Sequence, residues 1–364
     1  MRTGVILAGV LLFAGLFTAC QKPYDQGVIV QELQQQQLNP QLDTSYVELY
    51  PPFPGFAGAE DVCIGNDQLL YVADTRANRI VMMDRAGHVM STRTMLHPHA
   101  ITQDLRLDLL VGGEVVAANG DTVGAIFRVH LVSSNPDTAH HLEVSPIDTV
   151  WRELAKPGRR FPGIAAFFDN TYIAARNGPD NSSFIDLDGR VLLFDANDRF
   201  ITPVPALTTG TGSGITNIYN PMGLSVFPGV KDFLLIQASQ GVSYAGIWLQ
   251  YSVTSDFIGW LPKFDPANPD QRGIDFIRPN RFLLPSGVTV DNARRDVFIA
   301  DAALDSIFKF NSRGAFKPES FGFYRSGGAM RRPAGLAFFA TVLYVLDGQT
   351  GEILRYRLSA DVPH

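Results

Sequence analysis

Histidine and carboxylate side chains are the groups in this chain best suited to chemistry. His97 and His99 flank a single proline, and Glu60 stands directly before Asp61. Imidazole and carboxylate groups are common ligands of catalytic zinc, which takes three protein ligands and leaves one position open. No spacing among them is a recognised metal signature, so zinc or calcium is possible, but the sequence requires no cofactor.

A second acidic group consists of Asp180, Asp186 and Asp188, with a glycine directly after it. The segment resembles a calcium loop but lacks the Asp-x-Asp-x-Asp order and the distal glutamate, so an ordinary polar turn is the alternative. The chain also contains no Gly-x-Ser-x-Gly segment that would present a nucleophilic serine. These patterns favour binding over catalysis.

Composition limits the classes of partner. Of the 364 residues, 46% are hydrophobic and 18% are charged, a balance typical of a globular chain. The formal net charge of −6 provides no basic field to attract nucleic acid. We therefore expect no nucleic-acid partner.

The N-terminal 20 residues form a separate unit. A positive start at Met1-Arg2 precedes an apolar run from Val5 to Phe17, which is too short for a comfortable membrane span. The following Thr-Ala-Cys resembles a bacterial lipobox, although Phe17 stands where leucine is usual. The resemblance implies a lipoprotein signal peptide at 1–19 and acylation of Cys20; an ordinary signal peptide is the alternative.

Lipidation of Cys20 would anchor the mature protein outside the cytoplasm on a bacterial membrane, because two or more acyl chains anchor stably. Gln21 replaces the aspartate associated with inner-membrane retention, which favours the outer membrane. Residues 20–43 are expected to be a tether between this anchor and a domain at 44–364.

Six sequence repeats must position the reactive groups. Each repeat opens on an apolar stretch after a small or acidic anchor residue, then continues through two or three further short strands. The anchors are Asp61, Ala100, Gly163, Gly223, Gly287 and Gly335. Six repeats of about four strands each predict an all-β fold, a six-bladed β-propeller. An open β-sandwich is the alternative, but it would not explain why the strands keep the same order within every repeat.

Ring closure follows from the two ends of the domain. The last repeat ends near Leu358 after its third strand, whereas Ser45–Tyr50 is a strand pattern without a repeat of its own. We therefore expect the N-terminal strand to complete the C-terminal blade, which removes an open sheet edge. Fourth strands are expected near Val89, Phe200, Phe257 and Phe316.

The repeats resemble a known family. Ala73-Asp74-Thr75-Arg76-Ala77-Asn78-Arg79-Ile80 in the first repeat and Pro285–Asp291 with Val297–Asp301 in the fifth are similar to NHL repeats. The resemblance is good in repeats one, five and six. It implies a six-bladed ring and leaves the activity open, because such rings serve enzymes and binding modules alike.

Differences between repeats indicate where function lies. After the second strand, repeats one, five and six have a short turn led by an aspartate, for which backbone capping is the simplest role. Repeats two, three and four have longer turns at 114–124, 176–189 and 239–246, which we expect to crowd one side of the ring's face.

Two arginine pairs, Arg159-Arg160 and Arg331-Arg332, precede repeats three and six. If they face the channel mouth they could hold a carboxylate or phosphate; solvated ion pairs are the alternative. The full set of candidate ligand contacts is Glu60, Asp74, Arg76, His99, Arg160, Arg176, Asn177, Tyr244 and Arg332.

The sequence therefore favours an envelope lipoprotein that binds another envelope protein or a small ligand through its loop-rich face. The alternative is a metal-assisted hydrolase or lyase at the central channel, similar to gluconolactonases or to NHL-type amidating lyases. For these, Glu60 and His99 would match, but Met222 and Ser286 stand where a gluconolactonase asparagine would help. A purely architectural subunit is a third possibility.

Overall fold

The computed structural model describes residues 44–132, 141–183, 186–209, 214–238, 242–266, 273–322 and 330–362. The expected signal peptide at 1–19, Cys20 and the tether at 20–43 lie outside the described residues. Within the described ranges, no helix has the length and apolarity to cross a bilayer. A single turn of 3₁₀-helix, η1 (Ser359–Asp361), is assigned among them.

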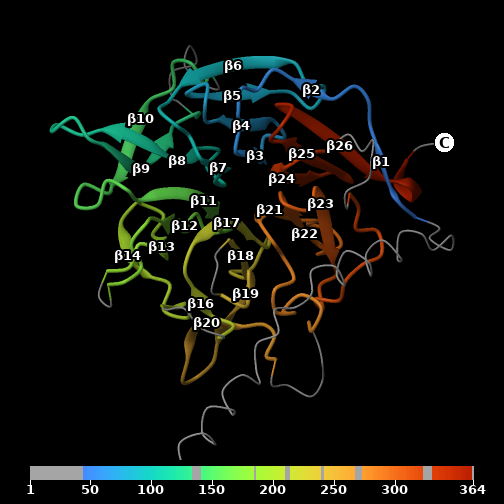
Figure 1. Cartoon of the computed structure of the whole chain (residues 1–364). Coiled ribbons are helices and arrows are strands. Elements are labelled where there is room, and N and C mark those ends of the chain that lie inside the picture. Colours follow the sequence, from blue (N-terminus) through green and yellow to red (C-terminus); the bar gives the residue numbers. More distant parts are fainter. Residues whose placement is uncertain are drawn as a thin grey trace, which may run out of the picture.

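Six antiparallel sheets stand around a central axis, which confirms the predicted six-bladed β-propeller (Figure 1). The first three blades have four strands each. Blade one consists of β3 (Asp61–Ile64), β4 (Leu70–Asp74), β5 (Arg79–Met83) and β6 (Val89–Thr94). Blade two consists of β7 (Ala100–Gln103), β8 (Leu109–Val116), β9 (Thr122–Val129) and β10 (Ile147–Arg152). Blade three consists of β11 (Arg160–Ala166), β12 (Tyr172–Asn177), β13 (Arg190–Phe194) and β14 (Phe200–Pro203).

The last three blades differ in their outer strands. Blade four consists of β17 (Pro221–Val226), β18 (Phe233–Gln237), β19 (Gly246–Val253) and β20 (Ile258–Pro262). Blade five consists of β21 (Pro285–Val290), β22 (Val297–Asp301) and β23 (Ser306–Phe310). Blade six consists of β24 (Pro333–Phe339), β25 (Val342–Asp347), β26 (Glu352–Leu358), β1 (Tyr46–Glu48) and β2 (Phe53–Pro54). A short parallel pair, β15 (Thr208–Thr209) and β16 (Asn217–Ile218), precedes blade four.

The outer strands correct two expectations. Blade two has a fourth strand, β10, which the sequence did not reveal. The prediction of a fourth strand near Phe316 is wrong. Within the described part of blade five, this segment forms only the isolated bridges Phe310↔Phe316 and Ile307↔Phe321. Aromatic packing covers this edge instead, with the Phe316 ring 5.9 Å from the Phe310 ring.

The N-terminal strand closes the ring as expected. β1 runs antiparallel to β26, with Tyr46 opposite Leu358 and Glu48 opposite Tyr356. Beside this ladder, the Leu49 amide donates to the Arg355 carbonyl at 2.7 Å. Figure 1 shows the blue start of the described chain lying along the red C-terminal strand. Both ends of the domain thus belong to one blade.

Hydrophobic packing between blades holds the ring together. The middle strands β4, β18, β22 and β25 are buried at every position, because each has strands on both sides and a blade against each face. Six hydrophobic clusters fill the six gaps between neighbouring blades. Val62 of blade one, for example, packs in one cluster with Leu346 of blade six. Each repeat therefore buries its faces only against its neighbours.

The innermost strands line the axis, and four of them are irregular where they begin. In blades three to six the register shifts at the start of the inner strand, for example between Pro221 and Gly223 and between Pro285 and Gly287. Blades one and two have continuous registers at the same place. A bulge re-aims the residues around it. This difference between blades shapes the mouth of the channel.

Candidate functional site

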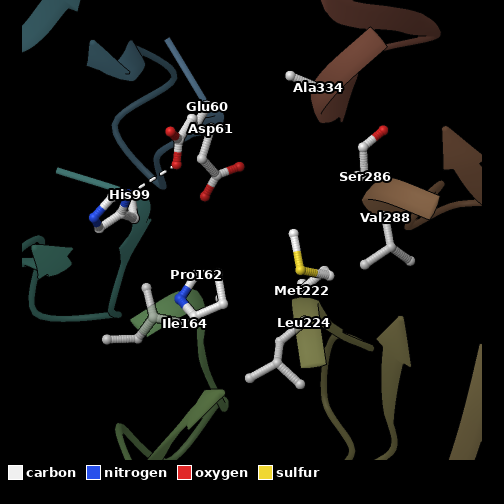
Figure 2. Close-up of a pocket in the computed structure, with 13 residues that line it drawn as sticks. Glu60, Asp61, His99, Pro162, Ile164, Met222, Leu224, Ser286, Val288 and Ala334 are labelled. Atoms are coloured by element: carbon white, nitrogen blue, oxygen red, sulfur yellow. Dashed lines mark hydrogen bonds and ion pairs between the residues drawn. The ribbon is translucent and has the colours of Figure 1, made fainter. Parts of the chain in front are cut away.

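A cavity of about 150 Å³ opens at the mouth of the central channel (Figure 2). It is bordered by the residue that directly precedes the anchor of every repeat. These six residues are Glu60, His99, Pro162, Met222, Ser286 and Ala334. The repeat thus provides six equivalent positions around one opening, and the side chains at these positions set the chemistry of the cavity's rim.

His99 forms the centre of the polar wall. Its Nδ1 lies 2.8 Å from Glu60 Oε2, and its Nε2 lies 3.5 Å from Glu114 Oε1. Burial alone would lower the pKa of His99, but the hydrogen bonds to the two glutamates outweigh burial and raise that pKa to about 9. The imidazole is therefore a cation at neutral pH, held between two carboxylates.

Glu114 links this wall to two further basic groups. His97 Nδ1 lies 2.7 Å from Glu114 Oε2, and Arg160 forms an ion pair with Glu114 Oε1. Burial would raise the pKa of Glu114, but its hydrogen bonds to His99 and His97 and the charge of Arg160 lower it to about 2. Glu114 was expected to begin a turn; instead β8 continues to Val116 and β9 begins at Thr122. The longer hairpin brings Glu114 to the mouth.

Asp61 borders the same cavity from the anchor of blade one. Its Oδ1 accepts from the Val62 amide and its Oδ2 accepts from the Ile101 amide of blade two, both at 2.9 Å. Burial raises the pKa of Asp61 to about 7 despite these two donors, and the charge of Glu60 adds to the increase. Asp61 therefore changes its charge near neutral pH.

The opposite wall is apolar. Figure 2 shows Met222, Leu224 and Val288 across the opening from Glu60, Asp61 and His99. Ser286 is the polar member of this side, and its Oγ donates to the Pro333 carbonyl at 2.5 Å. Its proton is thus committed to the backbone, which leaves the oxygen lone pairs as acceptors. The cavity has one charged wall and one largely apolar wall.

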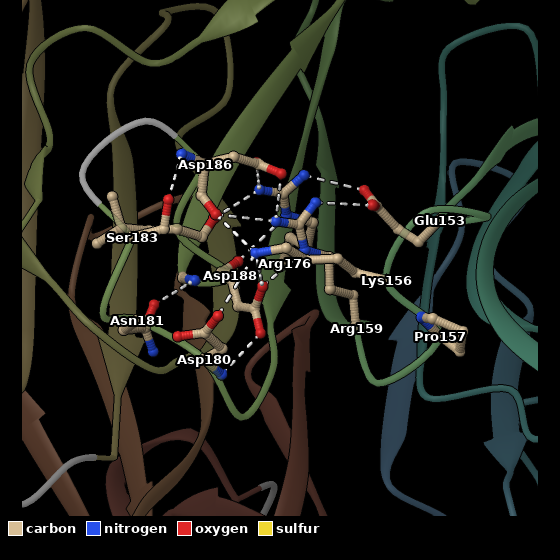
Figure 3. Close-up of polar contacts among 12 residues, drawn as sticks. Glu153, Lys156, Pro157, Arg159, Arg176, Asp180, Asn181, Ser183, Asp186 and Asp188 are labelled. Carbon is tan, nitrogen blue, oxygen red and sulfur yellow. Dashed lines mark hydrogen bonds and ion pairs between the residues drawn. The ribbon is translucent and has the colours of Figure 1, made fainter.

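A second group of charges lies where the segment between β10 and β11 meets the loop that follows β12 (Figure 3). Arg159 pairs with Asp188 at 2.8 Å, with Glu153 at 3.0 Å and with Asp186 at 2.7 Å. Arg176 pairs with Glu153 at 3.0 Å. Both arginine side chains are buried, with 3% and 5% of their surface exposed. We call this group the blade-three cluster: Glu153, Lys156, Arg159, Arg176, Asp180, Asp186 and Asp188.

The blade-three cluster gives the three aspartates of the calcium-like segment a different role. Asp186 and Asp188 are paired with arginines, and Asp180 lies 3.7 Å from Lys156 Nζ. Among the residues that the structure describes, no group of three or more histidine, cysteine, aspartate or glutamate side chains has the arrangement to hold a metal ion. The aspartates of this loop therefore neutralise cations of the chain itself.

The remaining candidates divide by position. Asp74 is fully buried, accepts from the Ala57 and Gly58 amides and pairs with Arg79 at 2.9 Å. Asp301 and Asp347 accept backbone amides in the same way. These three carboxylates cap turns.

Four other candidates lie around the face. Arg76 is exposed and passes over Gly58. Asn177 donates to the Pro221 carbonyl, beside the cavity wall. Tyr244 is half-buried against the core of blades four and five. Arg332 is exposed, does not border the cavity, and its amide donates to Asp305.

Of the candidates from the sequence, the cavity directly brings together Glu60 and His99, with Arg160 behind them through Glu114. Reasoning from the sequence placed Asp61 near the mouth and compared Met222 with a metal-site asparagine, but counted neither as a ligand contact, and it missed Glu114 as a member of the site. A usable signal existed for Met222, because it occupies the position equivalent to Glu60 and His99, one residue before its anchor. No such signal marks Glu114.

Comparison with solved structures shows the fold in proteins of different activity. The chain is similar to an auxiliary nutrient binding protein from Bacteroides thetaiotaomicron, with a TM-score of 0.56 and 13% identity, over 84% of this chain and 70% of that one. It is also similar to the PQQ-bound aldose sugar dehydrogenase of Streptomyces coelicolor, with a TM-score of 0.55, 14% identity, and coverage of 87% and 99%. A luciferin-regenerating enzyme gives a TM-score of 0.54, 13% identity, and coverage of 85% and 95%.

No protein-family model matches the chain, and no curated protein matches it in sequence. At identities of 13–14%, the structural neighbours establish the propeller fold alone. The neighbours are compatible with a binding module and with an enzyme, so the site's own chemistry must decide between them.

Proposed function

We propose that this chain is a lipid-anchored envelope protein whose NHL-type propeller binds a small molecule at the mouth of its channel. Acylation at Cys20 would hold it on the outer membrane, and residues 20–43 would separate the ring from the bilayer. An envelope protein docked on the long loops of blades two to four is the other partner that the sequence suggests.

The observation that carries the proposal is the two-sided cavity. Ligand sites are typically concave, mostly apolar, and supplied with a few placed polar groups that fix orientation. Here Met222, Leu224 and Val288 form the apolar part, and Glu60 with His99 forms the polar part. The rigid inner strands of all six blades hold these groups in place, and such pre-organisation lowers the cost of binding.

A hydrolase or lyase is the second candidate because of one residue. Asp61 borders the cavity and has a pKa of about 7, the value expected of a general base that works near neutral pH. Its oxygens already accept the Val62 and Ile101 amides, and these bonds join blades one and two. A structural role accounts for Asp61 without catalysis, so we favour binding.

Retention of a small molecule tests the proposal. The purified mature chain would be equilibrated with a soluble metabolite extract, washed, and its bound compounds measured by mass spectrometry. We expect the wild type to retain a compound that the Met222→Trp variant loses, because indole would fill the cavity. Equal retention by both proteins, with equal melting temperatures, would contradict binding at the mouth.

Two controls separate the alternatives. The Cys20→Ala variant should move from the detergent phase to the aqueous phase in a detergent partition assay, whereas unchanged partition would contradict acylation. A stoichiometric metal whose removal by a chelator abolishes turnover of the retained compound would favour the hydrolase or lyase over simple binding.

A further inference from the structure

We infer that the mouth cavity takes a small organic monocation, a protonated amine on a short apolar body, with the ammonium beside Glu60 and Asp61 and the apolar part along Met222, Leu224 and Val288. This inference rests on the proposed binding function and names its ligand class. Its support comes from the charges of the wall, from the partners of those charges, and from the size of the cavity.

The charges around the mouth leave one negative charge to be neutralised. Three carboxyl groups, Glu60, Asp61 and Glu114, face two cations, His99 and Arg160. When the carboxyl groups are ionised, these five groups have a net charge of −1, from three negative charges and two positive charges. A monocation in the cavity balances this charge, whereas an anion increases the imbalance.

The cations at the mouth are already committed to carboxylates. His99 is shared by Glu60 and Glu114, and Arg160 pairs with Glu114. By contrast, within the described residues Glu60 uses only Oε2 in a side-chain hydrogen bond, and its carboxylate is half exposed. An ionised carboxylate accepts several hydrogen bonds, so Glu60 Oε1 can receive an ammonium proton. The polar wall can therefore form further hydrogen bonds mainly as an acceptor.

The opposite wall and the volume restrict the body of the ligand. Met222, Leu224 and Val288 offer no hydrogen-bonding group except the weak thioether acceptor. An apolar protein cavity of about 150 Å³ holds a body of about benzene's size. A cavity of about 150 Å³ here therefore matches an apolar body of this size.

Protonation of Asp61 should be linked to binding. The groups around its carboxyl are Glu60, the Cys63 thiol, His99 and the amides of Val62 and Ile101, while the facing residues of blade six are Ala334 and Gly335. A bound ammonium favours the ionised carboxylate, so binding should release a proton near pH 7. Affinity should consequently rise as the pH increases from 6 to 8.

Three probes of matched length test the ligand class: n-butylammonium, 1-butanol and butyrate, each titrated into the full mature chain by calorimetry or ligand-observed NMR. We expect n-butylammonium to bind most tightly and Glu60→Gln to weaken it about tenfold, because the variant loses a charge-assisted hydrogen bond to the ammonium. The amide oxygen in this variant can still accept from His99. The matched control is Glu143→Gln, which removes an exposed carboxylate away from the cavity and should change nothing.

The outcomes distinguish this inference from the proposed function. Binding of 1-butanol or butyrate as tightly as n-butylammonium, abolished by Met222→Trp, would overturn the cation inference and leave mouth binding intact. Binding of none of the probes, or equal binding by Glu60→Gln, would also overturn it, while the retention experiment decides the proposed function separately. The Asp61→Asn variant should remove the pH dependence, and a pH dependence that persists would contradict the linkage.

Discussion

Two consecutive arginines enter two different environments. Arg159 turns into the blade-three cluster, where 3% of its side chain is exposed and three carboxylates surround it. Arg160 turns to the channel mouth, where 30% of its side chain is exposed and Glu114 is its single acidic partner among the described residues. Both sites contain an arginine paired with carboxylates, yet they differ in how many carboxylates each arginine contacts and in how far its side chain is buried.

The blade-three cluster uses its charges to shape a loop. Arg176 also donates to the carbonyls of Leu187 and Asp188, so the cations hold both backbone and carboxylates. The mouth instead keeps a carboxylate oxygen of Glu60 and the partly buried Asp61 beside an open cavity. The charges of the blade-three cluster are paired with one another, whereas Glu60 keeps an acceptor oxygen beside the cavity, and the proposed binding at the mouth depends on this difference.

The largest expected effect is on stability at the blade-three cluster. Arg159→Met should lower the free energy of unfolding by about 3–5 kcal/mol, because it leaves buried carboxylates without their partner. Arg160→Met should cost about 1 kcal/mol or less, since its pair is partly solvated. Urea unfolding followed by tryptophan fluorescence would compare the two variants. Similar losses for both would remove the distinction between the two sites.

A smaller effect should appear with pH at the mouth. The pKa of His99 is about 9, above its value of about 6.5 in an unfolded chain. The stability that His99 contributes is therefore complete below pH 6.5 and is lost as pH rises through 9. The loss relative to His99→Gln should be on the order of 2 kcal/mol between pH 7 and 10.

NMR titration of the His99 ring protons would measure that pKa directly. The blade-three cluster serves as the control: burial would lower the pKa of Arg159, but its hydrogen bonds with Asp188, Asp186 and Glu153 outweigh burial and raise that pKa above its ordinary value. The stability difference between the wild type and Arg159→Met should thus stay constant over the same pH range. A His99 pKa near 6.5 would contradict the ion-pair description of the mouth.

The smallest effect should come from the edge of the blade-three cluster. Lys156 lies 3.5 Å from Asp188 and 3.7 Å from Asp180, and 30% of its side chain is exposed. Lys156→Met should change the free energy of unfolding by about 1 kcal/mol or less, because peripheral ion pairs contribute little. The same unfolding experiment would measure this change. A loss of stability as large as that of Arg159→Met would show that burial does not determine how much each ion pair contributes.

Most of the fold was predictable from the sequence because each blade repeats one pattern of apolar strands. The six anchors, the order of the inner strands and the closure by Tyr46–Glu48 all agree with the structure. The outer strands were less predictable: β10 was missed, and the expected strand near Phe316 is reduced to an isolated bridge. Outer strands are half exposed, so their sequences carry a weaker hydrophobic period.

The site was predictable only in part. Glu60 and His99 could be placed at the mouth because their position follows from the repeat. The pairing of Arg176 could not be predicted, since it depends on how Glu153, from the segment before β11, and Asp186, from the loop after β12, fold against it. The same holds for Glu114, which reaches the mouth because β8 extends further than expected. Pairing between loops is decided by tertiary structure and leaves no local period.

The seam in blade six has a mechanical consequence. Three residue pairs between β1 and β26, with the bond from the Ser359 amide to the Ser45 carbonyl beside them, connect the N-terminal side of the chain to the ring. Any pull on the chain from that side loads these bonds before any other part of the propeller. Under tension β1 would therefore separate from β26 first, while β2 still pairs with β26 and blade six still packs on blade one.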